Sequence, residues 1–321
     1  MMYRTGEGSR PRWNARVLEA LCAVSVAWLM AGAPAHAQLM QLDMEPIKAI
    51  GDAPPTPTIS WVDDSVPAKG YLLCVHGLGL HKGTYAQFGE RMSKLGWGVY
   101  ACDVRGFGSF KDLGVATTVD FPGCLEDVHN ALEMVRKQAK GRPVFIVGES
   151  MGGAIALRIT SMYPDLVEGL ISSVPGGQRH GQAADSVKVG LHLLTGAHKN
   201  MDVRKIVVDR STQDSKMKEE WLNDQLARFD LSPVELIKFQ NFMSENHTAA
   251  KKITKTPVLM LCGKDDRLVQ TSSNEALIRD IPNGELIEVE GKEHLLLEEG
   301  QFTDPLIQVL TAWLSDHSHK N

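Results

Sequence analysis

The stretch VFIVGESMGGA, residues 144–154, places a serine between two glycines where an apolar run gives way to helical spacing. Residues 144–147 are continuously apolar, as in a strand that is buried on both faces. A sharp strand-to-helix turn strains its central residue, and flanking glycines leave room for the close approach of the backbone. We therefore predict that Ser150 lies on such a turn, facing the N–H groups and positive dipole end of a helix over residues 154–163. The alternative is an ordinary glycine-rich turn.

Short apolar runs and longer amphipathic segments alternate on both sides of this stretch. Continuous apolar strands separated by helices predict a mostly parallel sheet with helices on both faces. Residues 176–252 interrupt the alternation with helical patterns and no convincing strand, so we interpret them as a helical cap over the carboxyl ends of the strands. The strand-type runs occupy residues 71–75, 98–102, 166–174, 258–262 and 285–289, and helical spacing occupies residues 85–95 and 124–138.

A serine hydroxyl is a poor nucleophile until a base removes its proton. In a chain with this turn, an acid and then a histidine are expected to follow the serine. His294 directly follows the last apolar run and precedes an apolar segment that we predict to be a helix from Leu295. Asp265 and Asp266 compete as the acid, because neighbouring side chains in a turn point in different directions and only one should reach the imidazole. The spacing from Gly263 favours Asp266.

The oxyanion of a tetrahedral intermediate needs N–H donors close to the serine. We expect these donors to be the backbone N–H groups of Met151, directly after the serine, and of Leu78, in the loop that follows His76-Gly77. The rings of His76 and His81 are expected to brace this loop through hydrogen bonds.

Together these motifs resemble those of the α/β-hydrolase superfamily, in particular its monoacylglycerol lipase and lysophospholipase-like branch, which shares its profile with some serine aminopeptidases. The resemblance extends from about Ser60 to Leu314. It implies an α/β-hydrolase fold and a catalytic triad of Ser150, Asp266 and His294, since the family's acid stands three residues after the glycine that ends its strand. The motifs that carry it are HGLGLH (76–81), DVRGFG (103–108), GESMGG (148–153), GKDD (263–266) and His294.

The resemblance also implies a serine hydrolase that cleaves carboxylic esters of single-chain lipids, such as monoacylglycerols or lysophospholipids, through an acyl-enzyme. It is weakest in the cap, where an apolar helical face in residues 186–194 could cover an acyl chain or simply pack on the sheet. Two interpretations stay open beside it. One is a peptidase that trims N-terminal residues, which would need cap carboxylates to hold a free amine, and the other is a catalytically silent binding protein. The ligand patterns predict no metal or organic cofactor.

The first residues carry the features of a secretory signal peptide. Arginines precede an apolar run over residues 17–33, and Ala35-His36-Ala37 offers small residues for cleavage, so we predict a signal peptide over residues 1–37 and a periplasmic or secreted protein. An uncleaved membrane anchor is the alternative, although the run is somewhat short for a spanning helix. The predicted order then continues with an extended lead-in (38–58), the hydrolase core (59–175 and 253–316) divided by the cap (176–252), and a tail (317–321).

The formal net charge of −5 comes from interspersed charges of both signs, so nothing indicates a nucleic-acid-binding surface. The expected partner is a small-molecule or lipid ester, with transient contact between the cap and a membrane surface as a further expectation. Cys74, Cys102 and Cys262 lie in or beside buried apolar runs and are expected to be free thiols, although an exported protein could oxidise them.

Overall fold

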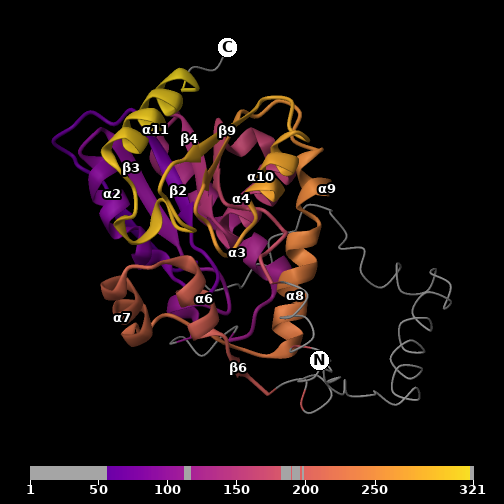
Figure 1. The fold of residues 1–321 in the computed structure, drawn as a ribbon. Coiled ribbons are helices and arrows are strands. Elements are labelled where there is room, and N and C mark those ends of the chain that lie inside the picture. The colour runs from indigo at the N-terminus through magenta and orange to yellow at the C-terminus, as the bar shows by residue number, and fades with distance from the viewer. Residues whose placement is uncertain (1–55, 112–116, 182–188, 190–195, 197–198, 319–321) are drawn as a thin grey trace, which may run out of the picture. The chain divides into compact units, whose positions relative to one another are not determined.

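The computed structural model describes residues 56–111, 117–181, 189, 196 and 199–318 (Figure 1). The predicted signal peptide, the predicted lead-in up to residue 55 and most of the apolar face predicted over residues 186–194 lie outside the described residues. Among the helices that are described, none combines the length and the apolar character needed to cross a bilayer.

Seven strands form one sheet in the spatial order β1-β3-β2-β4-β5-β8-β9. Every neighbouring pair is parallel except β1 with β3. The predicted mostly parallel sheet is therefore confirmed. The strands span Thr58–Trp61 (β1), Gly70–Val75 (β2), Trp97–Cys102 (β3), Val144–Glu149 (β4), Gly169–Ser173 (β5), Val258–Gly263 (β8) and Gly284–Val289 (β9).

Strand β1 was not expected from the sequence, which placed its first residue in the lead-in. It lies at the edge of the sheet and pairs antiparallel with β3, from Thr58 opposite Cys102 to Trp61 opposite Val99. None of its four residues is fully buried, so it lacks the continuous apolar run that marks the central strands.

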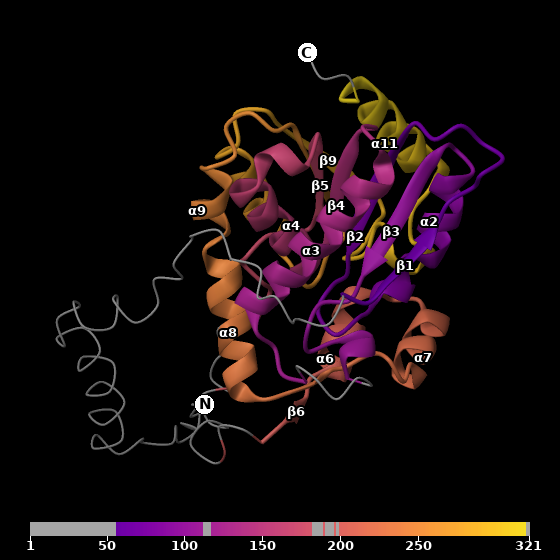
Figure 2. The ribbon, with the colours of Figure 1, turned by 180° about the vertical axis from the view of Figure 1, so that it is seen from behind.

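Helices cover both faces of the sheet, as Figures 1 and 2 show from opposite sides. Helices α3 (Phe121–Ala139), α4 (Met151–Met162) and α10 (Thr271–Ile278) pack on one face, and α2 (Ala86–Ser93) and α11 (Asp304–Asp316) on the other. Successive strand residues point to opposite faces. Leu73 and Ile146 therefore join the core beneath α3 and α4, whereas Leu72 and Phe145 join the core beneath α2 and α11.

The cap between β5 and β8 is mostly helical in its described part, with one correction. Two short strands, Met201–Asp202 (β6) and Asp230–Leu231 (β7), pair antiparallel within it. Each has only two residues, too few to show a strand pattern in the sequence. The cap helices are α6 (Arg204–Ser211), α7 (Ser215–Asn223), α8 (Pro233–Ser244) and α9 (Asn246–Ala250).

The segment after His294 is not the helix that its leucines predicted. The chain stays irregular until a 3₁₀ turn at Glu298–Gly300, and the next helix is α11. The backbone N–H groups of Leu296 and Leu297 donate instead to the buried carboxylate of Glu149, at 2.8 and 3.2 Å. This side chain takes the place of the carbonyl acceptors that a helix would supply.

The four described cysteines, Cys74, Cys102, Cys124 and Cys262, are buried free thiols. Burial raises the pKa of Cys262 to about 12 and raises the pKa of the other three as well. At neutral pH they therefore act as small apolar side chains and not as nucleophiles.

Candidate active site

Ser150 lies on the predicted sharp turn between β4 and α4. Its backbone angles, φ 55° and ψ −116°, are unfavourable for a residue with a side chain and indicate local strain. A Cβ atom on Gly148 would lie 2.2 Å from the carbonyl oxygen of Gly152, and one on Gly152 would lie 2.0 Å from that of Val75. Both glycines are therefore required by close backbone contacts. The N–H of Ser150 donates to the carbonyl oxygen of Ser173 at 2.8 Å, which fixes the turn on the neighbouring strand β5.

The structure pairs His294 with Asp266. Nδ1 of the ring lies 2.8 Å from Oδ2 of the carboxylate, and both residues are buried. The second oxygen of Asp266, Oδ1, accepts the backbone N–H groups of Leu268 at 2.7 Å and Val269 at 2.9 Å, so the carboxylate cannot turn freely. Asp265 is exposed. Asp266 is thus the aspartate that the fold brings to the imidazole, in agreement with the expected spacing.

The charges of this pair shift both pKa values. Burial alone would raise the pKa of Asp266, but the charge of His294, its hydrogen bond and two backbone N–H groups bring the net pKa below its ordinary value. Burial alone would lower the pKa of His294, but the charge and hydrogen bond of Asp266 raise the net pKa above its ordinary value. An ionised carboxylate on Nδ1 also holds the proton there, leaving Nε2 free to accept another.

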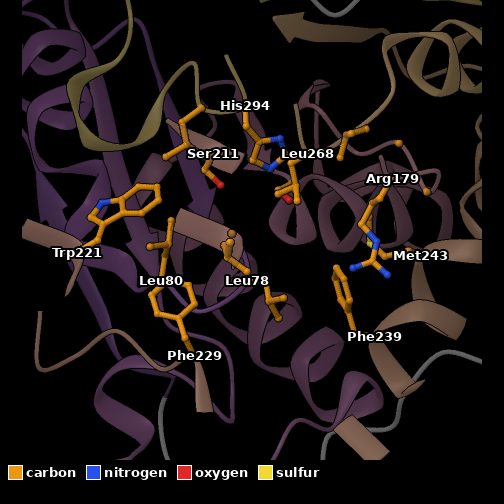
Figure 3. A pocket seen from close by; sticks show the side chains of 17 residues that line it. Leu78, Leu80, Arg179, Ser211, Trp221, Phe229, Phe239, Met243, Leu268 and His294 are labelled. Atoms are coloured by element: carbon orange, nitrogen blue, oxygen red, sulfur yellow. The ribbon is translucent and has the colours of Figure 1, made fainter. Parts of the chain in front are cut away.

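Ser150 and His294 line the same cavity, whose walls come from the core and the cap (Figure 3). The cavity has a volume of about 50 Å³. Among the described residues, the hydroxyl of Ser150 has no hydrogen bond to the ring of His294. In hydrolases without substrate, this contact is often long and tightens on binding. The other lining residues are Gly77, Leu78, Leu80, Gly176, Gly177, Arg179, Val207, Ser211, Trp221, Phe229, Phe239, Met243, Leu268, Val269 and Leu295.

One expected oxyanion donor begins the helix that follows Ser150, and the other lies in the loop after β2, the strand that pairs with β4. Met151 is the first residue of α4, where the N–H groups have no partner within the helix. Leu78 follows β2 and lines the cavity. We call residues 77–81 the oxyanion loop.

Hydrogen bonds of His76 and His81 hold the oxyanion loop in place. Nδ1 of His76 lies 2.8 Å from the carbonyl oxygen of Gly77, and Nε2 accepts the N–H of Val104 at 3.3 Å, which places the proton on Nδ1. Burial lowers the pKa of His76 to about 4, so the ring is neutral. Nε2 of His81 lies 2.8 Å from Oδ2 of Asp224 in the cap.

The cap contacts the oxyanion loop directly at Gly79. The N–H of Arg228 donates to the carbonyl oxygen of Gly79 at 2.8 Å. A Cβ atom on Gly79 would lie 2.3 Å from the ring of Phe229, and the residue has a φ of +82°. Glycine is therefore needed here both for the backbone conformation and for the packing of that ring.

The side chains that the cap contributes to the cavity were not identified from the sequence. Val207 on α6 lines the cavity, and Trp221 on α7 and Phe239 and Met243 on α8 line it as well, as Figure 3 shows for these last three. Their helical spacing fits packing on the core equally well, so periodicity alone could not assign them to the site. Within the described ranges, no group of His, Cys, Asp and Glu side chains is arranged to hold a metal ion.

Comparison with known protein families identifies the family to which this chain belongs. The family described as serine aminopeptidase, S33, matches residues 66–301. The chain belongs to this family. Among its relatives, human monoglyceride lipase is 26% identical over 80% of this chain and 86% of its own length, and the mouse monoglyceride lipase is 25% identical over 79% and 85%.

The fold of this S33-family chain is also found in solved structures. A soluble variant of monoglyceride lipase from Saccharomyces cerevisiae, in complex with a substrate analogue, superimposes with a TM-score of 0.68 at 20% identity. The superposition covers 86% of this chain and 99% of the yeast protein. The α/β-hydrolase fold is thereby confirmed.

Proposed function

We propose that the protein hydrolyses the ester bond of monoacylglycerols or similar single-chain lipid esters, with Ser150 as the nucleophile. Its membership of the S33 family and its similarity to monoglyceride lipases over most of both chains support ester hydrolysis. The observation that carries the choice of substrate is the lining of the cavity at Ser150, which is mainly apolar and contains no acidic side chain among its described residues.

The proposed reaction begins when Oγ of Ser150 attacks the ester carbonyl carbon while Nε2 of His294 takes the hydroxyl proton. The N–H groups of Leu78 and Met151 stabilise the oxyanion, and Asp266 stabilises the imidazolium. His294 then protonates the leaving alcohol, and the acyl group stays on Ser150. Water attacks this acyl-enzyme, gives its proton to His294 and releases the fatty acid, after which the proton returns to Ser150.

A second apolar cavity extends the proposed acyl site under the cap. It has a volume of about 90 Å³ and shares Leu78, Arg179, Val207 and Leu268 with the first cavity. Sites for drug-sized ligands usually measure about 300–1,000 Å³, so an acyl chain would require cap side chains to move apart. The cap residues that line only the second cavity are Val189, Met201, Val203, Ile206, Arg210, Leu236 and Gln240.

We propose that the polar end of the substrate lies in a different cavity from the acyl chain. An open cavity of about 550 Å³ shares Ser211 and Leu295 with the cavity at Ser150. Its other walls are largely charged or polar and include Asp265, Arg267 and Glu293. We assign the glycerol end of a monoacyl ester to this side, because a hydrated alcohol loses less hydrogen bonding there than in an apolar pocket.

The proposed function is tested by turnover of monoacylglycerols of graded chain length beside aminoacyl anilides. We expect hydrolysis of the monoacylglycerols, no turnover by Ser150→Ala, and an unchanged thermal midpoint in that variant. Hydrolysis of the anilides alone would refute the lipid-ester proposal and favour the aminopeptidase activity in the family's name. That activity requires an acidic group for the free amine: the cavity at Ser150 has none among its described residues, so Asp265 or Glu293 of the adjoining open cavity would have to bind the amine.

We further propose that the protein is exported and makes contact with a lipid surface. The N-terminal pattern favours export, and Ile206 and Leu222 on the adjoining cap helices α6 and α7 are 37% and 49% exposed, which suits brief contact with a lipid surface. Sequencing the N-terminus of the protein recovered from a bacterial periplasm should give Gln38. Co-sedimentation with lipid vesicles should fall in the double variant Ile206→Ser, Leu222→Ser, and unchanged binding would contradict the surface contact.

A further inference from the structure

Two buried carboxylates that take no part in the proposed reaction lie beside the catalytic residues. Glu149 directly precedes Ser150 and is fully buried. Its Oε1 accepts the hydroxyl of Ser173 at 2.6 Å and the N–H of Leu296 at 2.8 Å. Its Oε2 accepts the N–H groups of Leu297 at 3.2 Å and Glu298 at 2.9 Å. Glu149 therefore joins the strand that carries the nucleophile to the segment that follows His294.

Glu298 continues this connection to the oxyanion loop. It too is fully buried, and its two oxygens accept the N–H of Gly77 at 3.2 and 3.1 Å. Oε1 also accepts the hydroxyl of Thr84 at 2.7 Å. A Cβ atom on Gly77 would lie 3.2 Å from Oε2, so glycine lets the carboxylate approach the backbone closely.

The Gly77 peptide is adjacent to the group that binds the oxyanion. The N–H of Leu78 belongs to the next peptide, whose carbonyl oxygen on Gly77 is held by Nδ1 of His76 at 2.8 Å. With Glu298 holding the N–H of Gly77, both sides of this residue are fixed. The direction of the Leu78 N–H therefore depends on Glu298.

The two carboxylates accept hydrogen bonds from different numbers of donor groups. Glu149 accepts from four groups, whereas Glu298 accepts from two. Burial raises the pKa of both, and the charge of Glu149 raises the pKa of Glu298 further, to well above its ordinary value. Glu298 is therefore the more easily protonated member of the pair, and Glu298→Gln is its conservative replacement, since the glutamine keeps the length of the side chain and an acceptor oxygen.

We propose that Glu149 and Glu298 are positioning residues that align His294 and the N–H of Leu78 with Ser150. The proposal rests on the serine hydrolase function above. A one-ångström displacement of a catalytic group can cost about 100-fold in rate, and loss of an oxyanion donor costs a similar factor. Removal of Glu298 should therefore lower the rate of attack by Ser150 much more than it lowers substrate affinity.

The experiment uses the full chain and a fluorophosphonate probe, which phosphonylates an activated serine without knowledge of the natural ester. Labelling of Ser150 is followed by intact mass. Glu298→Ala should label about 10–100-fold more slowly than the wild type, and Glu298→Gln within about threefold. With an ester substrate, Glu298→Ala should lower kcat by a similar factor and leave KM within about twofold.

A matched control comes from Glu168, another shielded carboxylate that holds a backbone N–H. It accepts the N–H of Val144 at 2.6 Å, at the end of β4 opposite to Ser150, and its side chain is 7% exposed. Glu168→Ala should lower the thermal midpoint as Glu298→Ala does, and yet label within about threefold of the wild type.

Each outcome decides the proposal. Equal labelling of Glu298→Ala and the wild type, or equal slowing in Glu168→Ala, overturns the positioning role and leaves the hydrolase function intact. A wild-type protein whose Ser150 is not labelled overturns both. If Glu298→Ala does not fold, Glu298→Asp takes its place, since the shorter side chain cannot reach Gly77 and Thr84 together. Wild-type labelling by a folded Glu298→Asp then overturns the proposal.

Discussion

Replacement of Asp266 by asparagine should inactivate the enzyme through the tautomer of His294. Oδ1 of Asp266 accepts the N–H groups of Leu268 and Val269 at 2.7 and 2.9 Å, and an asparagine oxygen must stay on that side because only an oxygen can accept them. The amide NH₂ then faces Nδ1 of His294, where Oδ2 now lies at 2.8 Å. Nδ1 becomes the acceptor, and the ring proton moves to Nε2.

A ring with its proton on Nε2 cannot take the proton of Ser150. In serine hydrolases, this substitution lowers kcat by about 10⁴-fold, equivalent to about 5 kcal/mol of transition-state stabilisation. The assay is kcat/KM for a short-chain p-nitrophenyl ester. Asp265→Asn is the control, because Asp265 is exposed and the p-nitrophenyl ester has no glycerol end to occupy the cavity that Asp265 lines, so the rate should change by less than about twofold. Equal losses in the two variants, or less than about a tenfold loss in Asp266→Asn, would refute the tautomer argument.

Three further predictions follow from the buried groups. The acid limb of the kcat/KM profile should have an apparent pKa above 6.5, since His294 must be neutral and its pKa is raised; a limb below 6.5 would contradict this. The pKa of Glu298 in the folded chain is raised well above its ordinary value of 4.5, so wild-type stability should fall as pH rises above 4.5, relative to Glu298→Gln. Thermal midpoints of both proteins at pH 5 to 8 check this, and a constant difference would count against a raised pKa of Glu298. Gly152→Ala should cost about 3 kcal/mol or more in urea unfolding, because its Cβ would lie 2.0 Å from the oxygen of Val75, and a loss below about 1 kcal/mol would contradict that contact.

The features that the sequence predicted correctly are the ones with local causes. Residues 144–154 predicted a strand, a strained turn and a helix because the two glycines are required by backbone contacts within and beside that turn. The mostly parallel sheet followed from continuous apolar runs, since both faces of such a sheet are buried. The choice of Asp266 over Asp265 agrees with the fold, although its role in catalysis stays a prediction.

The features that the sequence missed depend on contacts between distant segments. Three successive leucines after His294 fit a helix as well as a buried irregular chain, and only the carboxylate of Glu149 decides between them. Glu298 similarly gave no signal, since its partner Gly77 lies 221 residues away. The two-residue strands β6 and β7 are too short for any periodicity.

The packing of Phe229 on Gly79 joins the cap to the loop that carries Leu78, the proposed oxyanion donor. If the N–H of Leu78 stabilises the oxyanion as proposed, a cap that moved away as a rigid body at this point would displace that donor and lower the activity. A lipid can enter without disturbing this contact only if other parts of the cap move, while residues 228–229 stay in place. Exchange of caps between relatives should accordingly preserve activity only where the new cap brings the aromatic ring and the receiving core has the glycine.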